Sequence, residues 1–600
     1  MVLGARDSNA AISDTRLNAP AGTQANDTLS RRRLIVLTFN VATWLALMYW
    51  ASSVLGFGGW TAVNALVLVC FGIGVLWPVL GFWNAVLGLW LLRRATPLAC
   101  VAPFLAAAGR AERLTVKTAI LMTLRNEDPL RALTRLAIVK DSLERTRDGS
   151  QFSYFILSDT NDIAIAAAEE LAVAGWRKDR GDAGRMVYRR RDLNSGFKAG
   201  NVRDFCERWG GGYELMLPLD ADSLMTGEAI INLVRIMQAN PQIGILQSLV
   251  VGTPSHSAFA RIFQFGMRLG MRTYTMGQAW WTADCGPYWG HNAVVRVKPF
   301  HEACDLPVLV GSPPLGGAIL SHDQVEAALM RRAGYEVRVM PIEGGSYEDN
   351  PPDALEFIRR DVRWCQGNMQ YLKLLTTPGL EPVSRFQLLW AILMFAGIPA
   401  WTIMIALLPL AAHHAQAMTD FPATSAKLLY GTFLAMYLAP KIAGFIDALL
   451  TKGEVKRFGG AFRFLSGAAI ELIFSFLQGA VSTIRISIFM IGLLFGRSIL
   501  WGGQARDPRG LTWREATEAL WPQLAFGISI FGALYAVSPK LLAWSLPLTA
   551  GYLLAIPFAV LTASPRLGRF MHRYGIAGIP EDFAPPFELA ALQTKVATHL

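Results

Sequence analysis

The chain has 600 residues, of which 52% are hydrophobic and only 17% are charged, whereas a soluble domain usually carries about 25% charged residues. This composition excludes an ordinary soluble globule, and it excludes a disordered chain, which would have few apolar residues and many charges. In so hydrophobic a chain, the formal net charge of +11 is more typical of basic residues at the inner ends of membrane helices than of a nucleic-acid-binding surface. The six cysteines form no C-x-x-C pair, which argues against a disulfide framework and against a zinc site.

The N-terminal region predicts a flexible tail followed by two transmembrane helices. Residues 1–30 are mostly small and polar, and we expect no fixed structure there. Three arginines, Arg31–Arg33, then precede an apolar run over 34–53, and a second run over 63–92 ends in two more arginines. Each run reaches the roughly 20 residues that a spanning helix needs, and the basic outer flanks predict that both ends lie inside. A twin-arginine export signal is the rival interpretation, which the second span disfavours.

Residues 95–384 form no apolar run of that length and predict one large cytoplasmic α/β domain. Apolar runs return over 385–562, where we expect about six transmembrane or re-entrant helices around a basic cytoplasmic loop at 451–463. The run over 464–500 is too long for one comfortable pass and has basic residues on both flanks, so it predicts a pair of short helices that return to the same side. The total is then about eight helices, and residues 563–600 form a cytoplasmic tail.

Arg485 lies inside the 464–500 run. An arginine at membrane depth is costly, so we expect it to face protein or a water-filled path, with an interfacial position as the alternative.

Three short apolar strands in the middle domain each end in acidic or polar residues. They cover 118–124, 152–157 and 213–219, and helical segments at 130–148 and 163–174 follow the first two. This alternation predicts a mostly parallel sheet with helices on both faces. Ligands bind such sheets outside the carboxyl ends of the strands. One acidic turn is usually a solvated loop, but three at successive strand ends favour a functional site.

The third strand ends in Asp220-Ala-Asp222, and two carboxylates at alternate positions are able to hold a hard divalent cation together with phosphate oxygens. Such a metal would neutralise a diphosphate as it leaves. Lys198 lies in the phrase Asn194-Ser-Gly-Phe-Lys-Ala-Gly-Asn201, where a lysine at a helix start suits a diphosphate, although a solvated lysine is an equal alternative. The chain has no P-loop motif and no dinucleotide-binding glycine motif.

Three further polar segments follow. The phrase Trp289-Gly-His291-Asn292 is, by itself, an ordinary polar turn before a strand. Asp323 begins a helix, where it is either a general base or simply a helix cap. Arg363-Trp364 precedes the returning membrane helices, and such a pair is able to bind phosphate and to stack on a sugar; the alternative is a surface charge.

These segments, in this order, resemble the processive family-2 glycosyltransferases, the group of cellulose, hyaluronan and chitin synthases. The phrases Trp289-Gly-His-Asn292, Leu320-Ser-His-Asp323 and Arg363-Trp-Cys-Gln-Gly-Asn368 are more closely similar to the glucans biosynthesis glucosyltransferase H family of osmoregulated periplasmic glucan synthesis. The motifs extend over about 115–375, and the flanking helices agree in layout. The resemblance implies a glycosyltransferase-A-type domain.

The resemblance also implies the chemistry. It implies UDP-glucose as donor, Mg²⁺ or Mn²⁺ as cofactor, and an inverting reaction that builds a β-1,2-linked glucan chain. The enzyme would lie in the bacterial inner membrane, with its catalytic domain in the cytoplasm, and would pass the growing glucan across the lipid bilayer. Acyl carrier protein and a periplasmic glucan-processing protein are further candidate partners, and no nucleic acid is implied.

Residue by residue, the resemblance implies six roles. Asp159 and Asp162 fall in the uridine-binding turn, and Lys198 lies near the diphosphate. Asp220 and Asp222 are the metal pair, and Asp323 is the catalytic base. The remaining matches are the acceptor-site residues His291 and Asn292, with Arg363 and Trp364 at the diphosphate and acceptor end of the gate.

Two positions depart from the wider family. Arg360 stands where a glutamine begins the Q-x-x-R-W motif, which puts an acceptor role for this position in doubt. His322 stands where the family has a glutamate before the base, which affects acceptor choice but keeps the base.

Two rival functions remain. One is a transferase that moves a single sugar to a polyprenyl phosphate, and the other is a transporter with a regulatory soluble domain. The large domain between the helices and the lack of a visible internal repeat disfavour the transporter.

Overall fold

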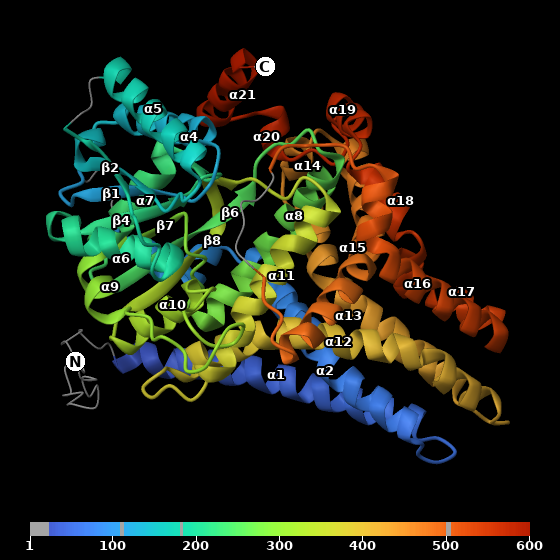
Figure 1. Ribbon diagram of the computed structural model, residues 1–600. Coiled ribbons are helices and arrows are strands. Elements are labelled where there is room, and N and C mark those ends of the chain that lie inside the picture. The colour runs from blue at the N-terminus through green and yellow to red at the C-terminus, as the bar shows by residue number, and fades with distance from the viewer. Residues whose placement is uncertain (1–22, 109–112, 181–183, 500–505, 600) are drawn as a thin grey trace, which may run out of the picture.

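The computed structural model describes residues 23–108, 113–180, 184–499 and 506–599. Its middle part is built on one eight-stranded sheet with the order β3-β2-β1-β4-β7-β6-β8-β5 (Figure 1). The strands are β1 Thr118–Leu124, β2 Phe152–Ser158, β3 Met186–Arg190, β4 Leu215–Asp220, β5 Leu224–Met225, β6 Ile243–Gly252, β7 Ala293–Arg296 and β8 Glu336–Glu348.

One half of the sheet is parallel, as expected. β1 lies between β2 and β4, and Thr118 is level with Phe152 on one side and with Leu215 on the other. Every residue of β1 is buried, because helices cover both faces and a continuous apolar run is then the stable pattern. The strands end level with one another, since Leu124 pairs with Ser158 and Thr123 pairs with Asp220. The acidic residues that follow them therefore share one edge.

The other half of the sheet is mixed. β7 is antiparallel to both β4 and β6, β6 is parallel to β8, and β5 is antiparallel to β8. The sheet is thus less parallel than predicted, although the α/β class is confirmed. The short strand β7 runs antiparallel to β4 directly after the Trp289–Asn292 turn, so this turn lies at the edge where β1, β2 and β4 end.

Helices pack on both faces of the sheet over two separate cores. Alternate residues of β1 divide between them, because Ile120 and Met122 face one core while Ala119 and Leu121 face the other. The first core is covered by α4 Pro129–Glu144, α5 Ile163–Arg180 and α7 Gly227–Ala239. The second core is covered by α6 Phe197–Trp209, α8 Ala258–Thr282, α9 Val297–Ala303, α10 Asp323–Arg332 and α11 Ala354–Gln370.

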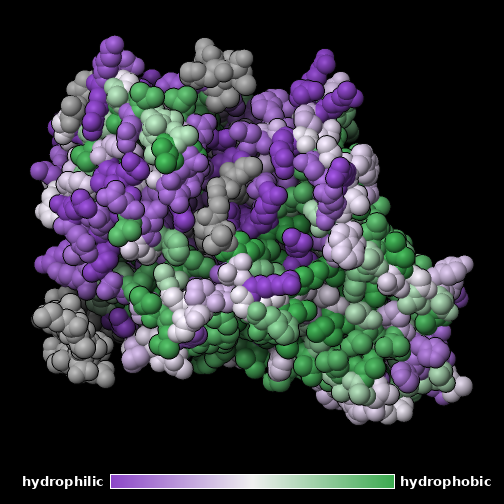
Figure 2. Space-filling view, viewed as in Figure 1, coloured by the Kyte–Doolittle hydropathy of each residue, from purple (hydrophilic) through white to green (hydrophobic). Residues whose placement is uncertain are grey.

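Long apolar helices flank this domain on both sides in sequence. They are α1 Thr23–Leu55 and α2 Ala62–Leu92, then α12 Pro382–Gln416, α13 Ala423–Leu450, α15 Ala461–Leu494 and α16 Trp513–Val537. In the described part of the chain, six helices are long and apolar enough to cross a membrane. A bent pair, α17 Pro539–Leu553 and α18 Ala555–Thr562, meets at 59° and brings the number to at most seven. Figure 2 shows hydrophobic residues over this bundle and hydrophilic ones over the sheet domain.

The predicted pair of short helices over 464–500 is wrong, because this region holds the single helix α15. Its sequence contains no proline, and the Thr483 hydroxyl donates to the Ala480 carbonyl within the same helix at 2.9 Å. The helix therefore continues through both polar residues, Thr483 and Arg485. Both ends nevertheless meet the sheet domain. Phe464 lies 6.1 Å from Phe265 of α8 between ring centroids, and beyond the other end the Ile499 amide donates to Gln366 of α11 at 2.8 Å. Among the described residues, the helices able to span a membrane number at most seven, one fewer than the expected eight.

Two further expectations change. Arg485 is exposed, so it does not pack against neighbouring protein, while a water-filled path and an interfacial position stay predictions. The predicted tail at 563–600 contains α19 Pro565–Tyr574, α20 Pro580–Phe583 and α21 Phe587–His599. A further short helix, α14 Glu454–Arg457, lies between α13 and α15. Leu589 of α21 is buried in the same core as α4, so this segment is part of the folded domain. The predicted tail at 1–30 lies mainly outside the described residues, and α1 already includes Thr23.

Candidate active site

The reactive edge is formed where β1, β2 and β4 end. Asp159 follows β2, is almost fully buried, and accepts two hydrogen bonds from Arg191 at 2.7 and 2.6 Å. Asp162 is exposed and caps α5, because its carboxylate accepts from the amides of Ala164 and Ile165 at 2.9 and 3.0 Å. The two acids of the predicted uridine turn therefore lie in different surroundings, and only Asp159 is held by a buried cation.

Asp220 is the last residue of β4 and is neutralised from α6. The Lys198 ammonium forms an ion pair with its carboxylate, and the Thr123 hydroxyl donates to it at 3.3 Å. Burial raises the pKa of Asp220, but the positive charges of Lys198, His291 and Arg506 lower it by more, so the pKa lies well below its usual range. The carboxylate is thus ionised at neutral pH. Lys198 reaches it because Gly196 has a φ of 70°, which turns the chain into the first turn of α6.

Asp222 is nearly buried and pairs with a residue that lies far away in the sequence. Arg506, between α15 and α16, forms an ion pair with its carboxylate and lies 3.5 Å from the Glu127 carboxylate at the end of β1. Arg135 of α4 donates to the Asp222 backbone carbonyl at 3.0 Å. The segment after α15 therefore reaches the predicted metal pair.

The predicted base, Asp323, begins α10 and accepts a hydrogen bond from the Gln324 amide at 3.0 Å. The segment before it is held by α11 and the turn that follows. The Leu320 amide donates to Gln370 at 2.9 Å, and the Tyr371 hydroxyl donates to the Ser321 carbonyl at 2.8 Å. The carboxylate position is thus fixed by its own helix and by a second one.

His322, beside the base, forms a contact of 2.8 Å with Glu326. Burial lowers the pKa of His322, but the Glu326 carboxylate raises it more, so the net shift is upward. This partner is found one helical turn away in the same helix. His322, which replaces the glutamate of the wider family, therefore contacts Glu326 of α10 and also precedes the predicted base in the sequence.

The turn before β7 brings His291 and Asn292 to the same place. His291 lies 3.4 Å from the Ser223 hydroxyl and 3.4 Å from the Glu348 carboxylate. Asn292 is fully buried and donates to the Ser346 hydroxyl at 3.0 Å and to the Tyr347 carbonyl at 3.2 Å. Asn292 thus ties this turn to β8, and its amide faces the sheet.

Gly290 joins this turn to the base. It has a φ of 77°, and a Cβ atom built on it would lie 3.5 Å from the Cβ of Asp323. The buried Tyr288 lies close enough to the acids of both groups for their charges to affect its pKa. Burial raises its pKa well above the usual value, and the negative charges of Glu326, Asp323 and Asp220 raise it further. The structure therefore brings the base, the turn and the metal pair together.

Arg363 and Trp364 lie on α11, beside this cluster. Burial lowers the pKa of Arg363, while the charges of Glu356 and Glu127 raise it, and the net direction is downward. Trp364 is 43% exposed. The Arg360 guanidinium lies 4.4 Å from its ring centroid. The Trp364 ring is thus partly open to solvent and partly covered by Arg360, the arginine that replaces the family's glutamine.

The sequence reasoning missed Arg191 and Arg506, which bind two of the predicted acids. Arg506 lies on the basic flank that follows the 464–500 run, where the sequence indicates only the inner end of a membrane helix, and its pairing follows from its position next to the sheet. Arg191 carries no motif, but it stands next to β3 and therefore beside the end of β2.

Comparison with known proteins places this arrangement in a family. The family model described as glycosyl transferase family group 2 matches residues 215–439. The chain is 37% identical to glucans biosynthesis glucosyltransferase H of Xanthomonas euvesicatoria pv. vesicatoria (strain 85-10) over 88% of this chain and 87% of that one. It is 36% identical to the protein of the same name from Caulobacter vibrioides (strain NA1000 / CB15N) over 92% and 85%.

Among solved structures, the mannosyltransferase PcManGT from Pyrobaculum calidifontis, in complex with GDP-Man and Mn²⁺, matches with a TM-score of 0.40 and 19% identity. It covers 65% of this chain and 98% of that one. This likeness is loose, whereas the curated relatives align along nearly the whole chain. The chain therefore belongs to the glucans biosynthesis glucosyltransferase H family, within the family-2 glycosyltransferases.

Proposed function

We propose that this glycosyltransferase uses UDP-glucose to extend a β-1,2-linked glucan at the inner membrane, with inversion at the anomeric carbon. The observation that carries the proposal is the grouping of Asp220, Asp222 and Asp323 at one sheet edge, beside the membrane helices. The relatives' name supports the glucosyl group and the glucan. The donor nucleotide, the linkage and the passage of product across the membrane are parts of the proposal.

The chain's own residues divide the reaction into two tasks. Lys198 and Arg363 offer positive charge to the diphosphate of the leaving nucleotide, where charge-assisted hydrogen bonds are strong. Asp323 accepts the proton of an acceptor hydroxyl as that oxygen attacks the anomeric carbon from the face opposite the leaving group. A single displacement of this kind gives inversion. Trp364 offers an aromatic face on which an acceptor sugar stacks.

A divalent cation fits the Asp220 and Asp222 pair in charge and donor chemistry. Both carboxylates are now neutralised by Lys198 and Arg506, so an ion there would take the place of positive charge already present. Among the described residues, no three His, Cys, Asp or Glu side chains form a metal-ligating group, so donor phosphate oxygens would complete the shell. When bound, Mg²⁺ or Mn²⁺ would neutralise charge that develops on the leaving diphosphate.

Incubation of the purified protein with labelled UDP-glucose and Mg²⁺, followed by linkage analysis, tests the proposal. A β-1,2-linked polymer with release of UDP is expected. A product that carries one sugar on a polyprenyl phosphate would favour the lipid-linked alternative. Movement of label across a vesicle membrane without release of UDP would favour a transporter.

Asp323→Asn is expected to reduce glucosyl transfer to below about a tenth of the original rate, because general-base catalysis usually contributes 10²–10⁴-fold. UDP binding, measured by calorimetry, should change little. Asp305→Asn is a matched control, since that carboxylate is 71% exposed and pairs with Arg203. If the Asp323 variant keeps more than a tenth of the rate, another group is the base.

Asp222→Ala is expected to weaken metal-dependent UDP binding at least about tenfold, because even indirect partners of a metal ligand contribute 10–100-fold to metal affinity. The measurement is UDP affinity with Mg²⁺ and with EDTA, compared with the original chain. Equal metal dependence in the two proteins would remove Asp222 from the metal pair.

A further inference from the structure

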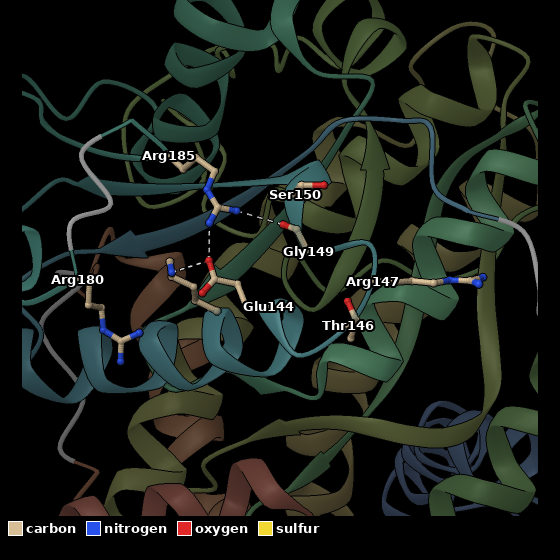
Figure 3. Close-up of a pocket in the computed structure, with 8 residues that line it drawn as sticks. Glu144, Thr146, Arg147, Gly149, Ser150, Arg180 and Arg185 are labelled. Carbon is tan, nitrogen blue, oxygen red and sulfur yellow. Dashed lines mark hydrogen bonds and ion pairs between the residues drawn. The ribbon is translucent and has the colours of Figure 1, made fainter.

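The outer face of α19 carries positive charge that no acidic residue in the described part of the chain balances. Arg566, Arg569 and Arg573 are all exposed, and none of them forms an ion pair with a carboxylate of the described residues. The helix itself contains no acidic residue. At the end of α4, by contrast, Arg185 donates to the Glu144 carboxylate at 2.5 Å (Figure 3). The three arginines of α19 are therefore open to a partner outside the chain.

These three arginines lie on one side of the helix. Each residue advances by about 100° around a helix axis, so positions 566, 569 and 573 fall within about 60° of one another. The helix dipole explains only one of them, because a cation is favourable in the last turn of a helix and unfavourable in the first. Arg573 is in the last turn, whereas Arg566 is the second residue of α19. Stabilisation of the helix itself therefore does not account for this face.

Two aromatic rings lie beside the arginines. Phe570 and Tyr574 are each 52% exposed, and their ring centroids are 4.8 Å apart. His572 marks the side of α19 that faces the sheet domain, because its Nδ1 lies 3.3 Å from the guanidinium of Arg261 in α8. The helical period places both aromatic residues within about 20° of the opposite side. The rings therefore point away from that domain, and exposed aromatic residues beside arginines are typical of a helix in a membrane interface.

Both ends of α19 meet apolar helices. Its first residue, Pro565, follows Thr562, the last residue of α18, after two residues, and three residue steps span at most about 11 Å. At the other end, Arg463 in the first turn of α15 donates to the Tyr574 carbonyl at 3.0 Å. Figure 1 shows α19 next to the end of α18. The helix thus extends from the end of one apolar helix to the start of another.

Exposed apolar side chains continue from α19 onto these two helices. Leu561 of α18 is exposed, and so are Phe462 and Leu465 in the first turns of α15. α15 is long and apolar enough to cross a membrane, and α18 belongs to the bent pair that passes the same test. α19 therefore lies along the boundary between the apolar helices and the sheet domain, which is the level of the headgroups when the apolar helices are in a bilayer.

We propose that the outer face of α19 binds anionic lipid headgroups, with Phe570 and Tyr574 inserted at the boundary between headgroups and acyl chains. Guanidinium groups bind phosphate oxygens in pairs. Lipid phosphates are spread over a surface, so the three arginines bind separate headgroups and need not converge on one anion. The inference rests on the membrane position that the proposed function gives to the chain, and it uses none of the residues assigned to glucosyl transfer.

Photo-crosslinking of the full-length protein in lipid nanodiscs tests this proposal. The discs contain phosphatidylcholine with a small share of photoreactive phosphatidylglycerol, and parallel discs contain photoreactive phosphatidylcholine instead. Mass spectrometry then locates the labelled peptides. Phosphatidylglycerol is expected to label peptides that cover 561–575 at least about tenfold more than phosphatidylcholine does, because each basic residue near an anionic surface adds to the attraction.

Removal of the three charges should abolish this preference. The variant that combines Arg566→Gln, Arg569→Gln and Arg573→Gln is expected to lower phosphatidylglycerol labelling of 561–575 at least about tenfold. Labelling of the original chain should also fall as the salt concentration rises. Arg569→Gln alone is the second variant if the triple variant unfolds at a lower temperature, and it should lower the labelling in the same direction.

The matched control removes the same charge from the sheet domain, through Arg177→Gln, Lys178→Gln and Lys298→Gln. These residues are exposed and lie on α5 and α9, so labelling of 561–575 should stay within about twofold. The proposal is overturned if the two lipids label 561–575 equally, because α19 would then only lie near the bilayer. It is also overturned if the variant without the three arginines is labelled as strongly as the control.

An acidic protein is the other kind of partner that this face could fit, and polyglutamate is the probe for it. Polyglutamate is titrated by calorimetry onto the full-length protein in detergent. Binding that the variant without the three arginines loses, together with equal labelling by the two lipids, would assign the face to an acidic protein and overturn the proposal. None of these results bears on glucosyl transfer, since no transfer is measured.

Discussion

At the scale of single residues, the reactive edge depends on compensated charge. Asp159 and Asp222 are buried and pair with Arg191 and Arg506, whereas Asp220 is half-buried and pairs with Lys198. A buried carboxylate without such a partner would be costly. Lys198, His291 and Arg506 also lower the pKa of Asp220, so this carboxylate is ionised, which is the form that holds a metal.

Asp361 is a buried acid that titrates differently. Burial raises its pKa from 3.8 to about 6, although Arg360 at 3.7 Å acts in the opposite direction. The folded state therefore binds this proton more tightly than the unfolded state, so stability is lost as the pH rises from about 4 to about 6 and stays lower above that. Asp361→Asn should remove this loss.

The expected gain for Asp361→Asn at pH 8 is about 1–3 kcal/mol, seen as a higher unfolding temperature in detergent. Near pH 4 the variant and the original chain should unfold at similar temperatures. Asp305→Asn is again the control, since an exposed acid should give no such difference. A variant that is less stable at pH 8 would show that the ionised Asp361 contributes a favourable pair with Arg360.

The two departures from the wider family acquire physical meaning at this scale. Arg360 lies 4.9 Å from the Phe357 ring centroid as well as over Trp364, so it belongs to an aromatic cluster at the surface of α11. His322 is tied to Glu326. Both replacements are thus held by neighbours from their own helices, which adjacent positions in a motif do not reveal.

At the scale of elements, α11 supports the segment that carries the base. Gly367 packs so closely that a Cβ atom there would lie 2.1 Å from the Ser321 hydroxyl oxygen. Gly367→Ala would have to push apart α11 and the Leu320–Asp323 segment. Such overpacking usually costs about 1–3 kcal/mol, and here it also displaces the base.

Gly367→Ala is therefore expected to lower the turnover rate more than tenfold while leaving UDP affinity within about threefold, because the misplaced group acts on the acceptor. Kinetic assays with UDP calorimetry measure both. Gly211→Ala is the control, since nothing lies within 4 Å of a Cβ built there. An unchanged turnover rate would mean that Asp323 tolerates movement of its support.

At the scale of the whole molecule, the C-terminal segment closes on the catalytic domain. Arg261 of α8 is fully buried and donates to Asp582 at 2.8 Å, and Arg268 donates to Glu581 at 2.9 Å. The Arg145 guanidinium lies 3.5 Å from the Phe587 ring centroid. Figure 1 shows α20 and α21 near α4 and α8, on the opposite side of the molecule from α1. Residues separated by more than 300 positions thus form one unit.

Asp582→Ala should destabilise the protein by about 3–5 kcal/mol, because it leaves the buried Arg261 without its carboxylate. Asp507→Ala is the matched control, since Asp507 is 90% exposed in its pair with Arg131 and such pairs contribute about 1 kcal/mol or less. Unfolding temperature in detergent compares the two. Equal small effects would show that water or another group replaces Asp582.

Sequence patterns alone predicted three strands and two helices of the catalytic domain, and the kinds of residues at the edge where those strands end. Apolar runs of strand length that end in acids are local patterns, and β1 occupies the predicted residues because its burial on both faces requires such a run. Membership of the family also followed from local phrases. The roles of the predicted acids in binding and catalysis stay predictions.

Three features could be known only from the three-dimensional packing: which cations pair with those acids, how the long 464–500 run folds, and where the C-terminal segment lies. Arg506 reaches Asp222 across more than 280 residues, and Asp582 reaches Arg261 across more than 300. Pairings of this kind depend on how layers stack and not on spacing along the chain. For α15, hydropathy indicated the length of the apolar run. The structure shows that the run forms one helix without a turn, with contacts to the catalytic domain at one end and just beyond the other.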